Sequence, residues 1–126
     1  MNNNPVGWFE IYVENMPRAR TFYETVLATK LTPLPKPPVI DLEMWAFPMA
    51  QNKGGASGAL VKMNGMNVGG NSTIVYFSCD DCAKEQSRVE RGGGRVQRPK
   101  TSIGEYGYIA LAFDTEGNIL GLHSLS

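Results

Sequence analysis

The chain has 126 residues, of which 42% are hydrophobic and 19% are charged. Twelve lysines and arginines balance twelve aspartates and glutamates, which argues against a nucleic-acid or membrane-surface partner because both attract cationic proteins. Two cysteines and one histidine are too few for a disulfide framework or an all-Cys/His zinc site. We expect one soluble, cytoplasmic domain over residues 1–126, and the polar segment 1–4 has no signal-peptide character.

The first half of the chain is expected to form a strand, a helix and further strands. Residues 7–13 are rich in aromatic and β-branched side chains, which favours a strand. Asn15 suits a helix cap and Pro17 the first helical turn, and an apolar stripe at helical spacing continues to Leu27. Two further strands are expected at 40–48 and 57–63. The glycine-rich segment 53–55 is expected to form the turn between them.

The second half repeats this plan, so each half follows the order strand, helix, strand, strand, strand. A strand is expected over 72–79, and the pair Asp80–Asp81 can cap a helix that runs to about Arg91 and stops at the glycines 92–94. Three further strands are expected at 94–98, 106–113 and 118–124. The two modules are expected at about 5–65 and 71–126.

The alternation of side chains along the first strand predicts two different faces. Its odd positions, from Phe9 to Val13, are all apolar and suit a core beneath a helix. Its even positions mix aromatic with polar groups: Trp8, Glu10 and Tyr12. Such a mixture is typical of a ligand cavity, in which apolar walls carry a few polar anchors. The alternative is that the even face is simply solvated.

The last strand shows the same alternation. Leu120 and Leu122 fall on one face, and Gly121 and His123 fall on the other. If the leucines pack on a helix, His123 shares the cavity side with Glu10. A carboxylate beside an imidazole can act as an acid–base pair, or both groups can be structural.

Cys79 and Cys82 form a CxxC pattern at a junction between a strand and a helix. Redox pairs occupy such junctions, because a helix N-terminus stabilises a thiolate. Two aspartates lie between these cysteines and oppose that effect, and no second pair completes a zinc site. We interpret both cysteines as structural.

Several segments together resemble one protein family. Residues 9–23, with the pairs Arg18–Ala19 and Phe22–Tyr23, are similar to the opening of the glyoxalase/bleomycin-resistance proteins of the vicinal oxygen chelate superfamily. The turn 113–118 resembles the turn that leads into the last strand of that family. The resemblance implies an α+β fold in which two βαβββ modules curl into an open sheet, called the cup below. It also implies a small-molecule ligand and a homodimer.

Enzymes of this superfamily usually bind a divalent metal with His and Glu ligands, one from the first and one from the last strand of each module. The resemblance places these positions on residues without a suitable donor atom: Trp8, Ile74, Gly121 and Ala59 or its neighbour Gly58. We therefore expect no cofactor.

The leading hypothesis is a metal-free cup that binds a small hydrophobic or aromatic molecule. Its expected walls are Trp8, Trp45, Phe47, Tyr76 and Gly121. Glu10 and His123 are the expected polar anchors and the candidate catalytic residues. The alternative is a divergent metal-dependent lyase or isomerase, similar to lactoylglutathione lyase, that uses Glu10, His123 and a third group. A further alternative is an interaction module with a filled core.

Overall fold

The computed structural model describes residues 5–38, 40–50 and 54–126. The segment 1–4 and Lys53 of the expected turn lie outside these residues. The elements of the described chain are, in order, β1 (Trp8–Tyr12), α1 (Met16–Val26), β2 (Thr32–Pro33), β3 (Glu43–Ala46), β4 (Ser57–Lys62), β5 (Val75–Ser78), α2 (Cys82–Gln86), β6 (Arg95–Ser102), the 3-10 helix η1 (Gly104–Tyr106), β7 (Tyr108–Phe113) and β8 (Ile119–Ser124).

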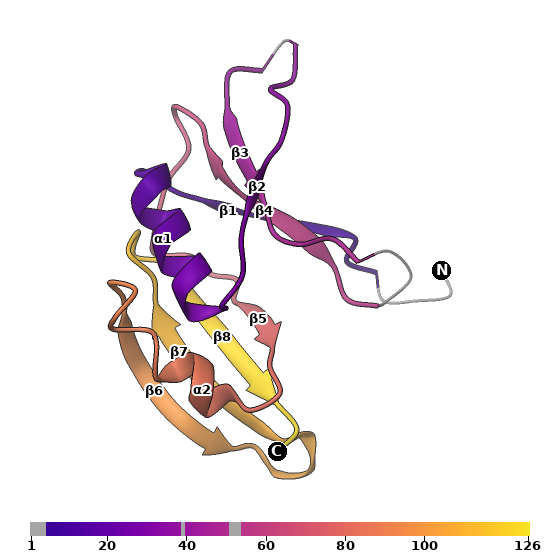
Figure 1. The fold of residues 1–126 in the computed structure, drawn as a ribbon, viewed down its shortest axis with the longest axis vertical. Helices are drawn as coiled ribbons and strands as arrows, with labels where there is room; N and C mark the ends of the chain where they lie inside the picture. Colours follow the sequence, from indigo (N-terminus) through magenta and orange to yellow (C-terminus); the bar gives the residue numbers. More distant parts are fainter. Residues whose placement is uncertain (1–4, 39, 51–53) are drawn as a thin grey trace.

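The strands form two four-stranded sheets of identical plan (Figure 1). The first sheet has the order β1-β4-β3-β2 and the second has the order β5-β8-β7-β6. In each sheet the first strand of the module runs parallel to the last, and the other neighbours are antiparallel. The expected α+β fold of two βαβββ modules is therefore confirmed.

Helix α1 begins where its cap was predicted. The side chain of Asn15 accepts a hydrogen bond from the backbone N–H of Arg18 at 3.0 Å, and Pro17 stands in the first turn. The apolar stripe of the helix is buried: Met16, Ala19, Phe22, Tyr23 and Val26. None of the helices in the described residues is both long and apolar enough to cross a bilayer.

Helix α2 is shorter than predicted, and this corrects the expectation of a helix to Arg91. The regular helix ends at Gln86. Beyond it, the backbone N–H of Arg88 bonds the carbonyl of Glu85, three residues back, and the hydroxyl of Ser87 donates to the carbonyl of Lys84 at 2.6 Å. Both contacts replace the regular α-helical pattern with tighter turns.

The other predicted strands occur with shifted ends. β3 is shorter than the range 40–48, β6 continues beyond 94–98 to Ser102, and η1 occupies the expected start of β7. The sequence did not place β2, whose two residues include Pro33 at the edge of the first sheet. Proline is tolerated there because an edge strand has one side without sheet partners.

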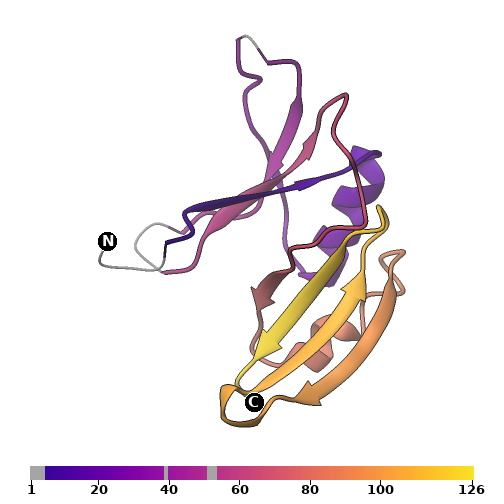
Figure 2. The same ribbon diagram turned by 180° about the vertical axis from the view of Figure 1, so that it is seen from behind.

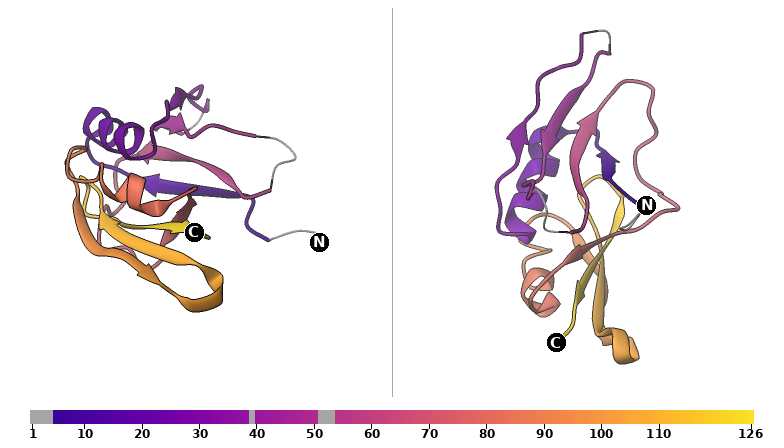
Figure 3. Two further views of the ribbon diagram at one scale, coloured as in Figure 1. Left: turned by 60° about the horizontal axis from the view of Figure 1, so that its bottom comes forward. Right: turned by 90° about the vertical axis from the view of Figure 1, so that its right-hand side faces the viewer.

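One core joins the two sheets and both helices. The rings of Phe9 on β1 and Phe77 on β5 lie with their centroids 6.0 Å apart, and Tyr23 of α1 lies 6.0 Å from Phe77. Leu120 and Leu122 of β8 are buried in the same cluster. Both helices lie on the inner side of the angle that the two sheets make (Figure 3).

Each sheet consequently has one face turned away from the core, because successive side chains along a strand point to opposite faces. We call the outer face of the first sheet the Trp8 face; it carries Trp8, Glu10, Tyr12, Ala59 and Val61. We call the outer face of the second sheet the Tyr76 face; it carries Tyr76, Ser78, Ile109, Gly121 and His123. Figure 2 shows the second sheet from this side, with neither helix in front of it.

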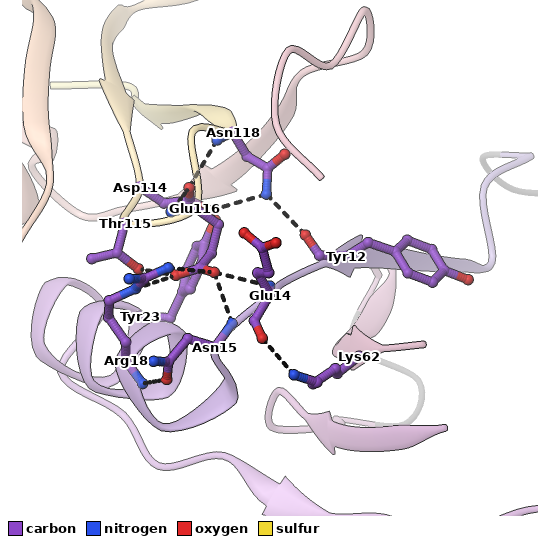
Figure 4. A network of polar contacts seen from close by, with 10 residues as sticks. All are labelled: Tyr12, Glu14, Asn15, Arg18, Tyr23, Lys62, Asp114, Thr115, Glu116 and Asn118. Carbon is purple, nitrogen blue, oxygen red and sulfur yellow. Dashed lines mark hydrogen bonds and ion pairs between the residues drawn. The ribbon is translucent and has the colours of Figure 1, made fainter. Parts of the chain in front are cut away.

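The turn between β7 and β8 is joined to the start of α1 by a buried carboxylate (Figure 4). The side chain of Glu116 is fully buried and pairs with Arg18 at 2.8 Å. It also accepts hydrogen bonds from Thr115 and from the backbone N–H groups of Glu14 and Asn15. Burial alone would raise the pKa of Glu116, but these donors outweigh it and lower the pKa to about 2.

A second carboxylate of this turn lies beneath α1. The hydroxyl of Tyr23 donates to Asp114 at 2.6 Å, and the backbone N–H groups of Glu116 and Asn118 donate to the other carboxylate oxygen. Burial raises the pKa of Asp114 in spite of these hydrogen bonds. The pKa of Tyr23 is also raised, first by its own burial and then by the negative charge of Asp114. The turn therefore connects the second module to the first through polar contacts.

Candidate functional site

The Trp8 face presents a carboxylate between two aromatic side chains. The indole N–H of Trp8 donates to Glu10 Oε2 at 3.2 Å, and the hydroxyl of Tyr12 donates to Glu10 Oε1 at 2.8 Å. Trp8 is 40% exposed, and Glu10 is also exposed. The hydrogen bond to Glu10 raises the pKa of Tyr12, so the phenol stays protonated as a donor.

The Tyr76 face presents an aromatic ring over a glycine. Tyr76 and Gly121 are register partners on β5 and β8. A Cβ atom on Gly121 would collide with the ring of Tyr76, so the ring occupies the space of a side chain at position 121. Tyr76 is nevertheless 46% exposed. The ring therefore forms an open aromatic surface.

His123 lies two residues further along the same face. Its Nε2 atom is 2.7 Å from the carbonyl oxygen of Tyr106, which follows β6. A cavity of about 400 Å³ opens beside it, lined by Tyr76, Ser78, Ile103, Ile109 and His123. The sequence did not indicate Ile109 or Tyr106, because their position beside His123 depends on the pairing of β7 with β8 and on the turn before β7.

Glu10 lines a different cavity, of about 410 Å³, between β1, the loop 67–71 and the start of β8. The hydrogen bonds of Glu10 go to Trp8 and Tyr12, and the contact of His123 goes to Tyr106. The structure thus places the two candidate catalytic residues on separate outer faces of one chain. Their joint use as an acid–base pair remains a prediction.

Trp45 and Phe47 lie on the helix side of the first sheet, not on the Trp8 face. Trp45 pairs with Leu60 in the register of β3 and β4, and Leu60 is buried in the core. Phe47 is buried and its ring lies 5.7 Å from that of Tyr23. This placement differs from the one expected from sequence, and a role of either residue in ligand binding stays a prediction.

The structure also settles which residue of β4 shares the Trp8 face. Glu10 pairs with Ala59 in register, so Ala59 belongs to this face, whereas a Cβ on Gly58 would collide with Phe9 on the helix side. The four positions at which the resemblance places metal ligands are therefore Trp8, Ala59, Ile74 and Gly121.

None of these four residues offers a donor atom that binds a divalent metal in proteins. Within the described residues, no three His, Cys, Asp or Glu side chains come together as a possible metal site. The side chains of one chain do not fit the metal of the family.

The two cysteines do not form a disulfide in the structure, and Cys82 is buried. Burial, followed by the nearby carboxylate of Glu85, raises the pKa of Cys79 to about 12. A protonated thiol is a poor nucleophile, so this environment supports the structural interpretation of the CxxC pattern.

Three solved structures resemble this fold over nearly the whole chain. Glyoxalase I from Zea mays is 20% identical, with a TM-score of 0.73, and the match covers 95% of this chain but 46% of that chain. TnmS3, an antibiotic binding protein from Streptomyces sp. CB03234, is 24% identical, with a TM-score of 0.68, and the match covers 100% and 99%. The fosfomycin resistance protein FosX from Listeria monocytogenes is 8% identical, with a TM-score of 0.67, and the match covers 100% and 94%.

This chain spans about half the length of the Zea mays enzyme. A comparison with curated proteins found no match. The family model described as Glyoxalase/Bleomycin resistance protein/Dioxygenase superfamily matches residues 6–122. Since this match includes both modules, the chain belongs to the glyoxalase/bleomycin resistance protein/dioxygenase superfamily.

Proposed function

We propose that this protein binds a small hydrophobic or aromatic molecule without a metal, in a cup that two copies of the chain build together. The Trp8 face of one copy would form one wall, and the Tyr76 face of the other copy would form the opposite wall. A symmetric pair of copies would then contain two equal cups.

One observation carries this proposal: the two candidate faces lie on the outside of a core that both sheets share. Because Phe9 and Phe77 meet within this core, the alternating residues Trp8 and Tyr76 point away from it. Both aromatic side chains remain 40% or more exposed in the single chain. A second copy would cover them and would place Glu10 of one chain and His123 of the other around one cavity as polar anchors.

A binding protein shares this fold over its whole length: TnmS3, described as an antibiotic binding protein, matches this chain from end to end. The residues at the metal-ligand positions also lack donor atoms, which weakens the case for metal-dependent chemistry. We retain the cytoplasm as the proposed location, because two free cysteines suit a reducing compartment.

The experiment measures mass by light scattering and the binding of acridine, a flat apolar probe, by calorimetry. We expect a dimer that binds acridine, and we expect Trp8→Ala and Tyr76→Ala each to abolish binding. A mixed dimer of the two variants, isolated through two different tags, should regain one intact cup. A cup within one chain would regain none, and absence of acridine binding by the wild type would contradict the proposal.

A metal titration separates this proposal from the lyase or isomerase hypothesis. Nickel, zinc and manganese are titrated into the wild-type protein and into Glu10→Ala. Weak binding that is equal in both proteins is the expected result. A tight metal, one per chain, that is lost in Glu10→Ala would favour the enzyme.

A further inference from the structure

The first sheet contains two similar pairs of a tryptophan and a glutamate. On β3 the indole N–H of Trp45 donates to Glu43 at 3.0 Å, and on β1 that of Trp8 donates to Glu10 at 3.2 Å. In each pair the residues are two positions apart and therefore share one face of the strand. Both hydrogen bonds hold a carboxylate beside the edge of an indole ring.

The indole ring of the pair on β3 already lies against an organic cation. The guanidinium of Arg20, from α1, lies 3.4 Å from the centroid of the Trp45 ring. The face of an indole ring attracts cations through its quadrupole. A carboxylate that accepts a hydrogen bond from the indole N–H makes this face more negative and strengthens the attraction. The chain thus shows that the indole ring of this pair accommodates a guanidinium, whose ion pair is with Glu24 at 3.5 Å rather than with Glu43.

The pair on β1 has the same chemistry without a cation. In the described part of the chain, no ion pair or cation–π contact includes Trp8, Glu10 or Tyr12. Tyr12 adds a second aromatic donor, so both oxygens of the Glu10 carboxylate are fixed in position. A carboxylate held in this way does not lose side-chain freedom when a cation binds, which favours affinity.

We propose that the ligand of the cup is a planar organic cation, with its charge on the group formed by Trp8, Glu10 and Tyr12. The inference rests on the proposed function and specifies its ligand class. The cationic part of the molecule would stack on the indole ring of Trp8, and the carboxylate of Glu10 would neutralise its charge. Tyr76, which covers Gly121 on the opposite wall, would stack against the flat body of the molecule.

The test compares two probes of equal shape and different charge, acridine and N-methylacridinium, above neutral pH, where acridine is uncharged. Calorimetry measures both with the wild type, with Glu10→Gln and with the matched control Glu43→Gln. The glutamine variants remove the charge and keep one oxygen that accepts from the indole N–H; at Glu10 the amide NH2 takes the place of the oxygen that accepts from Tyr12, whose hydroxyl can accept from it instead. We expect the wild type to bind N-methylacridinium about tenfold more tightly than acridine.

Glu10→Gln should remove this preference, so that the variant binds the two probes with equal affinity, and Glu43→Gln should keep the preference. Equal affinity of the wild type for both probes would overturn the inference and leave the proposed function intact. Binding of neither probe would overturn both. Loss of the dimer in Glu10→Gln, without a charge preference in the wild type, would instead assign the carboxylate to the contact between copies.

Discussion

The ring of Tyr76 covers Gly121, its register partner on the neighbouring strand, so that position 121 has no room for a side chain unless the ring moves. The family resemblance assigns a metal ligand to this position. In this chain the space is filled by an aromatic ring from the adjacent strand. The ring of Tyr76 can lie in this position only because residue 121 is a glycine without a Cβ atom.

This relationship predicts an energetic coupling between the two positions. Gly121→Ala should lower the free energy of unfolding by about 1 kcal/mol and displace the ring, which is exposed enough to swing outward. In the Tyr76→Ala background, the same change should have almost no effect on stability. A double-mutant cycle by urea unfolding measures the coupling. Equal effects of Gly121→Ala in both backgrounds would show that the ring does not occupy this space.

The buried carboxylate of Glu116 predicts a large loss of stability on neutralisation. Glu116→Gln keeps the shape but removes the charge that Arg18 and two backbone N–H groups share, which should cost about 2 to 3 kcal/mol. The exposed Glu90 provides the control, since Glu90→Gln should change stability by less than about 0.5 kcal/mol. Urea unfolding measures both, and similar values for the two variants would contradict a structural role of Glu116.

The lowered pKa of Glu116 predicts that its contribution to stability disappears in acid. The pKa is about 2 in the folded chain, against an ordinary value of 4.5. Its stabilisation is therefore present above the ordinary value and is lost as the pH falls toward about 2. The raised pKa of Asp114 acts in the opposite sense, since its protonation favours the folded chain.

The difference between the wild type and Glu116→Gln isolates the first effect, because both proteins contain Asp114. Unfolding in urea at a series of pH values should show this difference shrinking steadily between about pH 6 and about pH 3. A difference that stays constant over this interval would mean that the pKa of Glu116 is the same in the folded and the unfolded chain.

Local patterns in the sequence predicted the elements that surround the core. The odd positions of β1 are the inward ones, with Ile11 in the core, and the predicted stripe of α1 is buried around Phe22. The leucines of β8 also face the core as expected. These predictions succeed because each face of a strand or helix is determined by residues close to one another in the chain.

The composition of the cup depends on pairing between distant segments and could not be derived locally. Trp45 lies on the helix side because β3 pairs with β4 in a register that puts it opposite Leu60. The separation of Glu10 from His123 follows from the way in which the two sheets meet, through Phe9 and Phe77. No periodicity within a single strand contains this information.

The C-terminal end of α1 predicts a stabilising substitution. Ala28 has a φ of 51° and is the one non-glycine residue of the described chain with a positive φ. The backbone N–H of Thr29 bonds the carbonyl of Glu24 at 3.2 Å, which is the closing hydrogen bond of a Schellman motif. This motif favours glycine at the position of Ala28, because a Cβ atom is strained in the left-handed region.

Ala28→Gly should therefore raise the free energy of unfolding by about 0.5 to 1 kcal/mol, since the relief of strain exceeds the added freedom of the unfolded chain. Ala83→Gly, at an exposed position of α2, serves as the matched control and should lower the free energy of unfolding by about 0.5 to 1 kcal/mol. Urea unfolding of the two variants side by side measures the opposite signs. A loss of stability in both would show that Ala28 does not adopt the left-handed conformation in solution.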